Sequence, residues 1–370
     1  MFLEGFACGA GCAAFARCAW KSLETNVSKG LANRNTGAQR RKACPPDVKV
    51  SDSYPVTGAY EYVIAKQSRA KNSRGFCTLA DGQNIFWQLW APERRARAGI
   101  IMFHGIGDHC DAMLALRAQA LCHLGSFAVA AFDMPGHGRS DGLIVCVESW
   151  SDFTAAVAEV VRDHLVPKLQ ALQANLKIFG MGDSMGGGVL FTILARERAL
   201  FAGVILVCPM LYVSEDLYPP AVVVQVFKHI IAPLLPMWPI APNKDIESRC
   251  WQDPEVMTSL RNYTMHQSIV YGQVKPRLCT AYQCAFVAGD MMKAHFADHD
   301  LPTLIFHSPD DVVTDYRVSK ELFDTMKGTD KQFVNPSGVW HGDMFHGGPK
   351  YYDAVQERFK LLVSWITARA

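Results

Sequence analysis

The sequence lacks several features that would point to particular classes of protein. Lysine and arginine number 37 and aspartate and glutamate 35, so the formal net charge is only +2. Nucleic-acid-binding proteins usually carry a concentrated basic surface, and this balance gives no reason to expect a nucleic-acid partner. The sequence also has no G-x-x-x-x-G-K motif for phosphate and no H-E-x-x-H motif for zinc. The chemistry has to be sought in other residues.

The 12 cysteines form no C-x-x-C pair, so they do not predict a zinc cluster. A small disulfide scaffold is excluded by the length of 370 residues, which is enough for one large core. We interpret most of the cysteines as buried thiols of a protein in a reducing compartment.

Long hydrophobic runs are also missing. A membrane-spanning helix needs about 18 or more apolar residues. The nearest stretch, residues 221–242, is interrupted by Gln225, Lys228, His229 and several prolines. We therefore expect a cytoplasmic protein that is soluble or peripherally associated with a membrane.

The first 53 residues differ in composition from the remainder. They are rich in alanine, glycine, asparagine and basic residues and poor in acids, and Cys44-Pro45-Pro46 is typical of a linker. We interpret residues 1–53 as a tail, either disordered with a short amphipathic helix or serving as an organelle-targeting segment. Acylation at Cys8, Cys12 or Cys18 is a further alternative. Residues 54–370 are predicted to form the folded domain.

From about Val56 onward, strand-like and helix-like segments alternate. Short apolar runs rich in β-formers, most of them unbroken, lie at Ile85–Trp90, Ile100–Phe103, Phe127–Phe132, Leu176–Phe179, Val204–Val207 and Leu304–Phe306. Helical spacing of apolar residues occurs at Met113–Leu124, Phe153–Leu172, Gly187–Arg198 and Tyr351–Ile366. Unbroken runs are typical of strands covered on both faces. The succession predicts an α/β fold with a mostly parallel, doubly wound sheet.

The alternation stops between about residues 209 and 301. This segment holds proline-rich apolar stretches and helical pieces and no clear strand pattern. We interpret it as a helical cap that is inserted into the domain and lies over the active site.

A G-x-S-x-G motif, Gly182-Asp183-Ser184-Met185-Gly186, lies between a predicted strand and a predicted helix. This is the context that a nucleophile elbow requires, because the chain must turn sharply to expose the serine at the top of the sheet. Small residues on either side let the strand and the helix approach each other. Ser184 is therefore the candidate nucleophile.

An oxyanion hole needs two backbone N–H donors. One donor normally belongs to the residue after the nucleophile, here Met185. The other should come from the loop after an earlier strand, where His104-Gly105-Ile106 follows the run that ends at Phe103. We predict that the amides of Ile106 and Met185 form the hole.

The acid and the base should follow late strands. Asp310 and Asp311 come just after the run that ends at Phe306, and His341 and His346 lie farther along the chain. The chain order of serine, aspartate and histidine is that of the α/β-hydrolase architecture. The glycine-rich stretch 133–142 also ends a strand, and we interpret it as a turn that braces neighbouring loops.

With these residues in view, the chain resembles the monoacylglycerol lipase and lysophospholipase branch of the α/β-hydrolases. It is most similar to the plant-type monoglyceride-lipase-like and caffeoylshikimate-esterase-like members. The resemblance covers about Tyr60 to Trp365. It rests on residues 104–109, 133–140, 182–187 and 340–341, with further similarity in the cap at 214–216, 240–245 and 275–278.

The resemblance selects among the candidate acids and bases. The family pattern H-G-x-x-D-x-V-T-D, laid on residues 307–315, selects Asp311 as the acid, and the preceding Trp340 selects His341 as the base. Two positions depart from the family. Ser308 replaces a usual glycine, and Asp183 stands where histidine or glutamate is common, which adds a negative charge beside the nucleophile.

The resemblance also implies a function. It implies a serine esterase that cleaves monoacylglycerols or lysophospholipids through an acyl-enzyme, without a metal or an organic cofactor. The apolar cap is predicted to form an acyl tunnel and a rim that touches a membrane, with Val223, Phe227, Leu234 and Trp238 as substrate-binding residues. The alternatives are a phenolic-ester esterase, a serine peptidase, an acyltransferase and a non-catalytic ligand-binding protein. No sequence feature indicates an oligomeric state.

Overall fold

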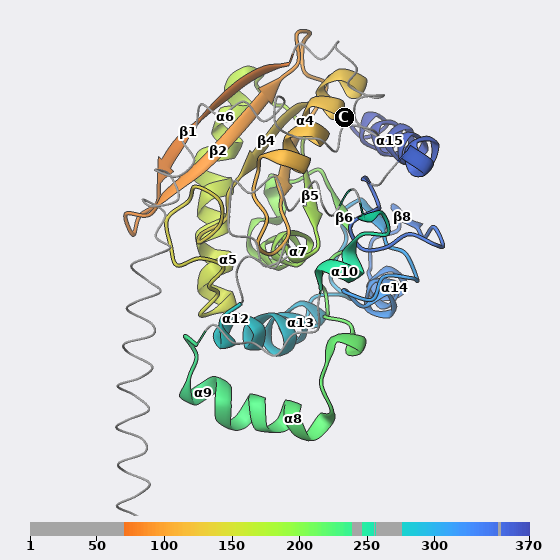
Figure 1. Ribbon diagram of the computed structural model, residues 1–370. Helices are drawn as coiled ribbons and strands as arrows, with labels where there is room; N and C mark the ends of the chain where they lie inside the picture. The colour runs from red at the N-terminus through yellow and green to blue at the C-terminus, as the bar shows by residue number, and fades with distance from the viewer. Residues whose placement is uncertain (1–69, 239–245, 255, 257–275, 347–348) are drawn as a thin grey trace, which may run out of the picture.

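A central sheet of eight strands organises the molecule (Figure 1). The structure, a computed structural model, describes residues 70–238, 246–254, 256, 276–346 and 349–370. The strand order is β1-β2-β4-β3-β5-β6-β7-β8. The strands are β1 (Lys71–Thr78), β2 (Asn84–Ala91), β3 (Gly99–Phe103), β4 (Ala128–Phe132), β5 (Ile178–Asp183), β6 (Gly203–Val207), β7 (Thr303–Phe306) and β8 (Lys331–Val334). β2 pairs antiparallel with both β1 and β4, and the other neighbours are parallel.

The burial of each strand explains whether its apolar pattern could be predicted from the sequence. Every residue of β3, β4, β6 and β7 is buried, as expected for strands covered on both faces. The predicted apolar runs fall in or partly in β2 to β7, and the α/β class with a mostly parallel sheet is confirmed. The edge strands β1 and β8 were not predicted, because an edge strand exposes much of its length and therefore carries polar residues.

Helices cover both faces of the sheet. α4 (Ala112–Gly125) and α15 (Tyr352–Thr367) bury their apolar side chains in the core on one face. A helical stretch of α5 (Trp150–Glu159), η2 (Val160–Leu165) and α6 (Val166–Leu172) covers the other face, together with α7 (Met185–Glu197) and α14 (Tyr316–Thr325). The sheet is therefore doubly wound, as predicted.

The sequence predicts a cap at about residues 209–301. In the structure these residues fall in the segment 208–302 between β6 and β7, and we call this segment the cap. Its described parts are mainly helical: η4 (Glu215–Leu217), α8 (Ala221–Val226), η5 (Phe227–Ile231), α9 (Ala232–Leu234), α10 (Glu247–Cys250), α12 (Leu278–Tyr282), η6 (Gln283–Val287) and α13 (Ala288–Lys293). In Figure 1, α8 and α9 form the outermost layer, and α12 and α13 lie between them and the sheet. The predicted tail, residues 1–53, and the resemblance segment 240–245 lie outside the described residues.

The topology brings candidate residues to one edge of the sheet. Ser184 follows β5 directly, Asp311 lies in the loop after β7, and His341 lies in the loop after β8. Because these three strands are parallel, their carboxyl ends meet at one edge, where open α/β sheets bind ligands. In the parts of the chain that the structure describes, every helix is too short or too polar to span a bilayer.

Candidate active site

Ser184 lies on a strained turn between β5 and α7. Its φ of 53° and ψ of −122° are unusual for a residue with a side chain, and such strain is typical of a nucleophile elbow. The flanking glycines make the turn possible. A Cβ at Gly182 would lie 2.5 Å from the carbonyl oxygen of Gly186, and a Cβ at Gly186 would lie 2.3 Å from that of Phe103. The backbone therefore passes where no side chain fits.

The structure brings Ser184, His341 and Asp311 together. The Oγ of Ser184 donates to the Nε2 of His341 over 2.9 Å, and the Nδ1 of His341 donates to the Oδ2 of Asp311 over 2.7 Å. The carboxylate fixes the tautomer of the imidazole, which leaves Nε2 free of a proton and facing the hydroxyl. In this arrangement His341 can take the hydroxyl proton as a general base.

Asp311 is held in its ionised form by its surroundings. Its Oδ1 accepts from the amides of Val313 and Thr314 over 2.7 and 3.1 Å, and its Oδ2 accepts from the Thr314 hydroxyl over 2.9 Å. The Nε2 of His307 lies 3.2 Å from the same Oδ2. Burial raises the pKa of this carboxyl, but His341 and His307 outweigh burial and hold the pKa well below its usual range.

The alternative acid and base, Asp310 and His346, do not contact Ser184, His341 or Asp311 in the hydrogen bonds described. Asp310 is exposed, and its carboxylate accepts from the amide of Gly338 over 2.6 Å. His346 is buried, and its Nε2 accepts from the guanidinium of Arg117 over 2.9 Å. Burial, followed by the charge of Arg117, lowers the pKa of His346 well below its usual value, so this imidazole is neutral.

The candidate oxyanion donors flank Ser184. Met185 is the first residue of α7, and an amide there has no partner within its own helix. The carbonyl of Gly105 accepts from the Asp108 amide over 3.2 Å and from the Nδ1 of His104 over 2.7 Å. Because a trans peptide points its N–H away from its carbonyl, these bonds turn the Ile106 amide away from the loop. That the amides of Ile106 and Met185 form the oxyanion hole stays a prediction.

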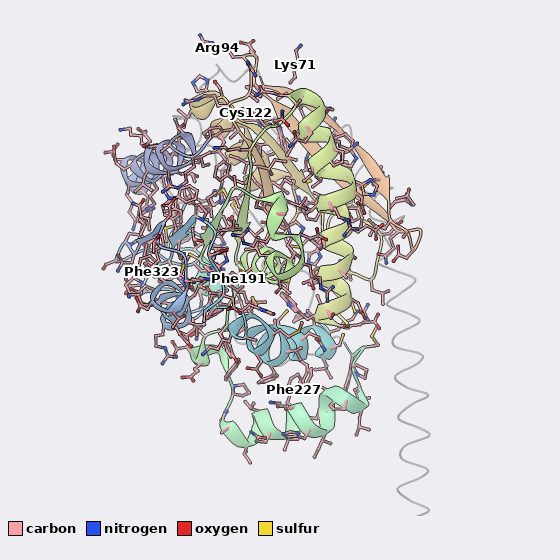
Figure 2. The ribbon with its side chains drawn as sticks, turned by 180° about the vertical axis from the view of Figure 1, so that it is seen from behind. Lys71, Arg94, Cys122, Phe191, Phe227 and Phe323 are labelled. Carbon is pink, nitrogen blue, oxygen red and sulfur yellow. The ribbon has the colours of Figure 1, made fainter. Side chains whose placement is uncertain are left out.

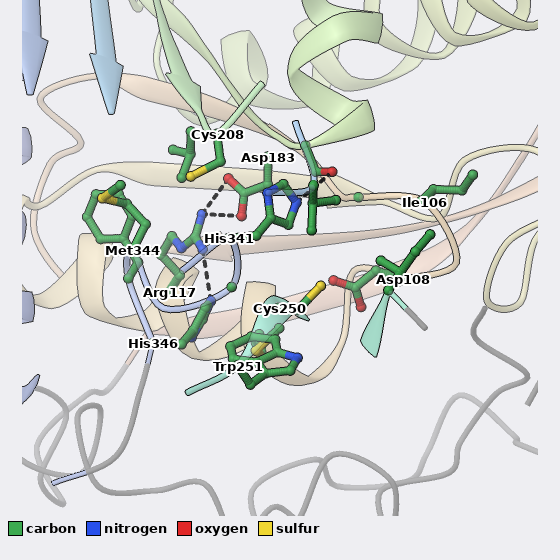
Figure 3. A pocket seen from close by; sticks show the side chains of 18 residues that line it. Ile106, Asp108, Arg117, Asp183, Cys208, Cys250, Trp251, His341, Met344 and His346 are labelled. Carbon is green, nitrogen blue, oxygen red and sulfur yellow. Dashed lines mark hydrogen bonds and ion pairs between the residues drawn. The ribbon is translucent and has the colours of Figure 1, made fainter. Parts of the chain in front are cut away.

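A charged network lies next to the nucleophile (Figure 3). Asp183, which the sequence singled out as a departure from the family, forms an ion pair of 2.6 Å with Arg117. Arg117 is buried, comes from α4 and also contacts His346. The negative charge beside the nucleophile is thus offset by a cation that sequence analysis did not anticipate, because Arg117 is 66 residues away along the chain.

Two cavities meet at Ser184, and both are lined by Ile106 and Ser184. The larger, with a volume of ≈ 160 Å³, extends into the cap and has a mainly apolar lining that includes Met210, Leu217, Val224, Phe227 and Phe286. The smaller, of ≈ 90 Å³, has charged and polar residues in its wall: Asp108, Arg117, Asp183, His341 and His346. The site therefore offers two compartments beside the hydroxyl, and the smaller one carries charged and polar groups in an otherwise largely apolar wall.

The four predicted substrate-binding residues are placed differently from one another. Phe227 lines the larger cavity and lies on the side of its helix that faces α12 (Figure 2). Val223 and Leu234 are 39% and 63% exposed, and Trp238 packs against the small apolar cluster inside the cap. Of the four, Phe227 lines the larger cavity, and the other three do not line it; substrate binding by any of them stays a prediction. Helical spacing fixes the faces of a helix but not which face lies against the body, and Val224, which lines the cavity, is one residue from Val223.

Sequence analysis also missed residues that support the acid. Thr314 and His307 both contact Asp311. The Oγ of Ser319 lies 2.8 Å from the Nδ1 of His307 and so fixes that ring from its other side. The only sequence signal for this contact was that His307 and Asp311 are four residues apart. In a turn, unlike a helix, that separation does not predict that two side chains meet.

Known proteins share this fold and parts of this sequence. Mouse monoglyceride lipase is 32% identical over 140 residues, which cover 37% of this chain and 43% of the relative, so the chain spans less than half the length of this relative. Caffeoylshikimate esterase of Arabidopsis thaliana is 24% identical over 282 residues, which cover 75% of this chain and 81% of the relative. A crystal structure of a soluble variant of Saccharomyces cerevisiae monoglyceride lipase in complex with a substrate analogue has a TM-score of 0.59 at 18% identity. It covers 88% of this chain and 100% of that chain, and it shows the shared fold.

A family model gives the assignment. Residues 94–346, more than half of the chain, match the family Hydrolase_4, described as "Serine aminopeptidase, S33". This range contains the strained turn at Ser184, both cavities and all three hydrogen-bonded side chains. The chain belongs to this family of α/β-hydrolases.

Proposed function

We propose that the protein is a serine carboxylic-ester hydrolase that cleaves monoacylglycerols through an acyl-enzyme. The observation that carries the proposal is the 2.9 Å contact between the Ser184 hydroxyl and the Nε2 of His341, at the junction of a larger apolar cavity and a smaller cavity whose wall carries charged side chains. An ester with one long acyl chain and a small polar alcohol has the same two-sided character. The similarity to monoglyceride lipases supports the same substrate class.

The reaction follows from the geometry. His341 removes the hydroxyl proton as Ser184 attacks the ester carbonyl, and the Asp311 carboxylate stabilises the imidazolium that forms. The amides of Ile106 and Met185 stabilise the oxyanion of the tetrahedral intermediate. His341 then gives its proton to the leaving alcohol. Water, activated by the same imidazole, attacks the acyl-enzyme and releases the fatty acid.

The two cavities divide the substrate between them. In the proposal the acyl chain enters the larger cavity, where apolar side chains such as Leu217, Phe227 and Phe286 replace water around the chain. The alcohol occupies the smaller cavity, where Asp108 and Asp183 offer carboxylate oxygens to its hydroxyl groups. Burial raises the pKa of Asp108 to about 6, so this carboxyl is ionised at neutral pH and can accept hydrogen bonds.

The outer helix of the cap supports peripheral contact with a lipid surface. Val222, Val226, Ile230 and Leu234 recur every four residues and are between 41% and 71% exposed. Such a stripe can enter the boundary of a bilayer, from which a monoacylglycerol would pass into the cap. Replacing Ile230 and Leu234 by serine should reduce sedimentation with phosphatidylcholine vesicles and leave the hydrolysis of a water-soluble short-chain ester unchanged. Undiminished sedimentation would remove this part of the proposal.

A substrate panel tests the central proposal. Purified protein and its Ser184→Ala variant should be assayed with monoacylglycerols of several chain lengths, lysophosphatidylcholine, a caffeoyl ester and an aminoacyl naphthylamide. We expect monoacylglycerol hydrolysis by the wild type and none by the variant. Turnover of only the caffeoyl ester or only the aminoacyl amide would replace the lipid assignment by an esterase for phenolic substrates or by a peptidase.

A further inference from the structure

Cys208 lies beside the proposed triad, although it has no part in the reaction. It follows β6 directly and lines the smaller cavity together with Ser184 and His341. Figure 3 shows its thiol near Asp183 and His341. A sulfur of Cys208, a carboxylate oxygen of Asp311 and a ring nitrogen of His341 all lie within 4.8 Å of one another. A thiol, a carboxylate and an imidazole are the side chains that bind zinc in proteins.

We propose that Cys208, Asp311 and His341 bind a thiophilic divalent cation, with Zn²⁺ as the best fit, and that the bound cation switches the hydrolase off. The binding part of this inference depends only on the cluster, and the inhibitory part depends on the proposed function. The cation is an inhibitor in this account, and catalysis proceeds without it.

The spacing of the three side chains suits a tetrahedral ion. Zinc lies about 2.0–2.3 Å from nitrogen, oxygen and sulfur ligands, which places the ligands of a tetrahedral site about 3.3–3.6 Å apart. The Nδ1 of His341 and the Oδ2 of Asp311 are 2.7 Å apart and need to separate only slightly. The remaining position of the ion would face the cavity, where water can complete the coordination.

The backbone at Cys208 is held rigidly. Its amide donates to the carbonyl of Phe306 over 2.7 Å, and its carbonyl oxygen lies 3.1 Å from the Thr314 hydroxyl. Its φ of 43° is strained for a residue with a side chain, and such strain persists only where the surroundings enforce it. Because Thr314 donates to Asp311, one hydroxyl links two of the three proposed ligands. A site that is held in place in this way loses little entropy when an ion binds.

The charges around the cluster favour a cation. Asp183 and Asp108 line the smaller cavity, and Arg117, which also lines it, is paired with Asp183. The buried carboxylate of Asp311 lies in the cluster itself. Burial raises the pKa of the Cys208 thiol well above its usual value, and the carboxylates of Asp311 and Asp183 raise it further. The sulfur lies within 4.8 Å of a carboxylate oxygen of Asp311, whose negative charge a dication would neutralise.

Binding would stop the reaction at the histidine. As the sulfur–metal bond forms, the thiol proton of Cys208 leaves to solvent. If the ion takes the Nδ1 of His341, the proton of that nitrogen is displaced and the neutral ring carries its proton on Nε2. Nε2 then cannot accept the proton of Ser184. The hydroxyl loses its base while the fold is unchanged.

Cobalt provides a test that does not depend on activity. Co²⁺ added to the purified full-length protein should give the near-ultraviolet absorption of a thiolate–cobalt bond, and Zn²⁺ should displace it. Cys208→Ser should lose this absorption. Cys250→Ser is the matched control, because Cys250 lines the same cavity but lies outside the cluster, and it should keep the absorption. No absorption in the wild type, or full absorption in Cys208→Ser, would overturn the site.

Inhibition is measured on the same variants. Zn²⁺ should slow ester hydrolysis by the wild type and by Cys250→Ser, and a chelator should restore it. Compared with its own rate without Zn²⁺, Cys208→Ser should need about tenfold more Zn²⁺ for the same fractional inhibition, since it lacks one ligand. Equal sensitivity of the two variants would contradict the proposal. If circular dichroism shows that Cys208→Ser does not fold, His341→Ala replaces it in the cobalt titration. A cobalt affinity equal to that of the wild type would then contradict the proposed site. A wild type without esterase activity would count against the proposed function and leave the cobalt result intact.

Discussion

The body and the cap of this molecule hold their functional side chains in opposite ways. In the body, buried polar groups are hydrogen-bonded or ion-paired to one another. Asp133 accepts from the amides of Cys110 and Arg139 over 2.7 Å each, and Arg139 pairs with Asp111 in the interior. In the cap, the cavity wall is mainly apolar, and the outer helix exposes several apolar side chains to solvent. The body thus holds polar side chains at defined hydrogen-bonding distances, whereas the cap provides an apolar surface.

The proposed chemistry explains this difference. Proton transfer between Ser184 and His341 requires a hydrogen bond of defined length and direction, so the body must be rigid. An acyl chain has no directional groups and needs only a dry, apolar lining. The two parts meet at a hydrogen-bonded joint. The Thr280 hydroxyl accepts from the Val147 amide over 2.9 Å and donates to the carbonyl of Val145 over 3.0 Å.

The same difference decides what the sequence could predict. The turn around Ser184 has a local pattern, because strand, glycines, serine and helix follow one another within a few residues. The order of Asp311 and His341 along the chain follows from the sheet topology. Spacing alone left Asp310 and His346 open as alternatives, and the similarity to a known family selected between them. These parts of the site could be named before the structure was known.

Contacts between distant segments could not be predicted in this way. The ion pair between Arg117 and Asp183 and the proximity of Cys208 to His341 join residues far apart in the chain, without a periodic pattern. In the cap, Val223 and Leu234 were expected inside because they are apolar. An apolar helix that faces both a cavity and solvent has the same composition on its two sides, so composition does not identify the inner side.

The largest effect is expected in the body. Asp311→Asn should lower kcat for ester hydrolysis by about 10³- to 10⁴-fold, because the amide no longer holds the Nδ1 proton of His341. Asp310→Asn is the matched control, since Asp310 is adjacent but exposed and bonded only to the Gly338 amide among the contacts described. It should change kcat by about twofold or less. Similar losses in both variants would contradict the placement of the acid.

The cap should respond through substrate choice. Phe227→Ala should lower kcat/KM for a long-chain monoacylglycerol by about tenfold, because an aromatic ring is lost from the cavity wall. Hydrolysis of a butyrate ester, whose chain is too short to need that wall, should stay within about twofold of wild type. Val223→Ala is the control on the same helix and should leave both rates unchanged. Equal losses on both esters would place Phe227 in the catalytic machinery and break the division between the two regions.

The loop that carries His341 should be sensitive to pH. Burial raises the pKa of Asp343 to about 7. The folded protein therefore holds a proton that the unfolded chain releases near pH 4, and the stability gained from that proton is lost as the pH rises through about 7. Asp343→Asn stays neutral, so it should increase the free energy of unfolding at pH 8 by about 1–2 kcal/mol and by less at pH 5.

Denaturant unfolding at the two pH values measures this difference. Asp298→Asn, at an exposed position, is the control and should give the wild-type pH dependence. An Asp343→Asn variant with the same pH dependence as wild type would show that this carboxyl is already ionised in the folded protein.

The smallest effect concerns the joint between body and cap. Cys146, in the body loop before α5, and Cys279, on α12, have their sulfur atoms 3.7 Å apart. Diamide should oxidise the two thiols to a disulfide and is itself reduced to the hydrazine derivative. The free energy of unfolding of the protein should change little, because the two sulfur atoms are already close together. Peptide mass spectrometry without reductant should find the linked pair in the wild type and in Cys284→Ser, but not in Cys146→Ser. An absent link in the wild type would show that the cap does not rest on the body as described.

The account depends most on the hydrogen bond between Ser184 and His341, and fluorophosphonate labelling tests it directly. The reagent reacts with a serine that an adjacent base has activated. Mass spectrometry should locate the adduct on Ser184 in the wild type and find none in His341→Ala, which keeps the hydroxyl but lacks the imidazole. A wild type that remains unlabelled, or a His341→Ala variant labelled at the wild-type rate, would contradict the activation of Ser184 by His341.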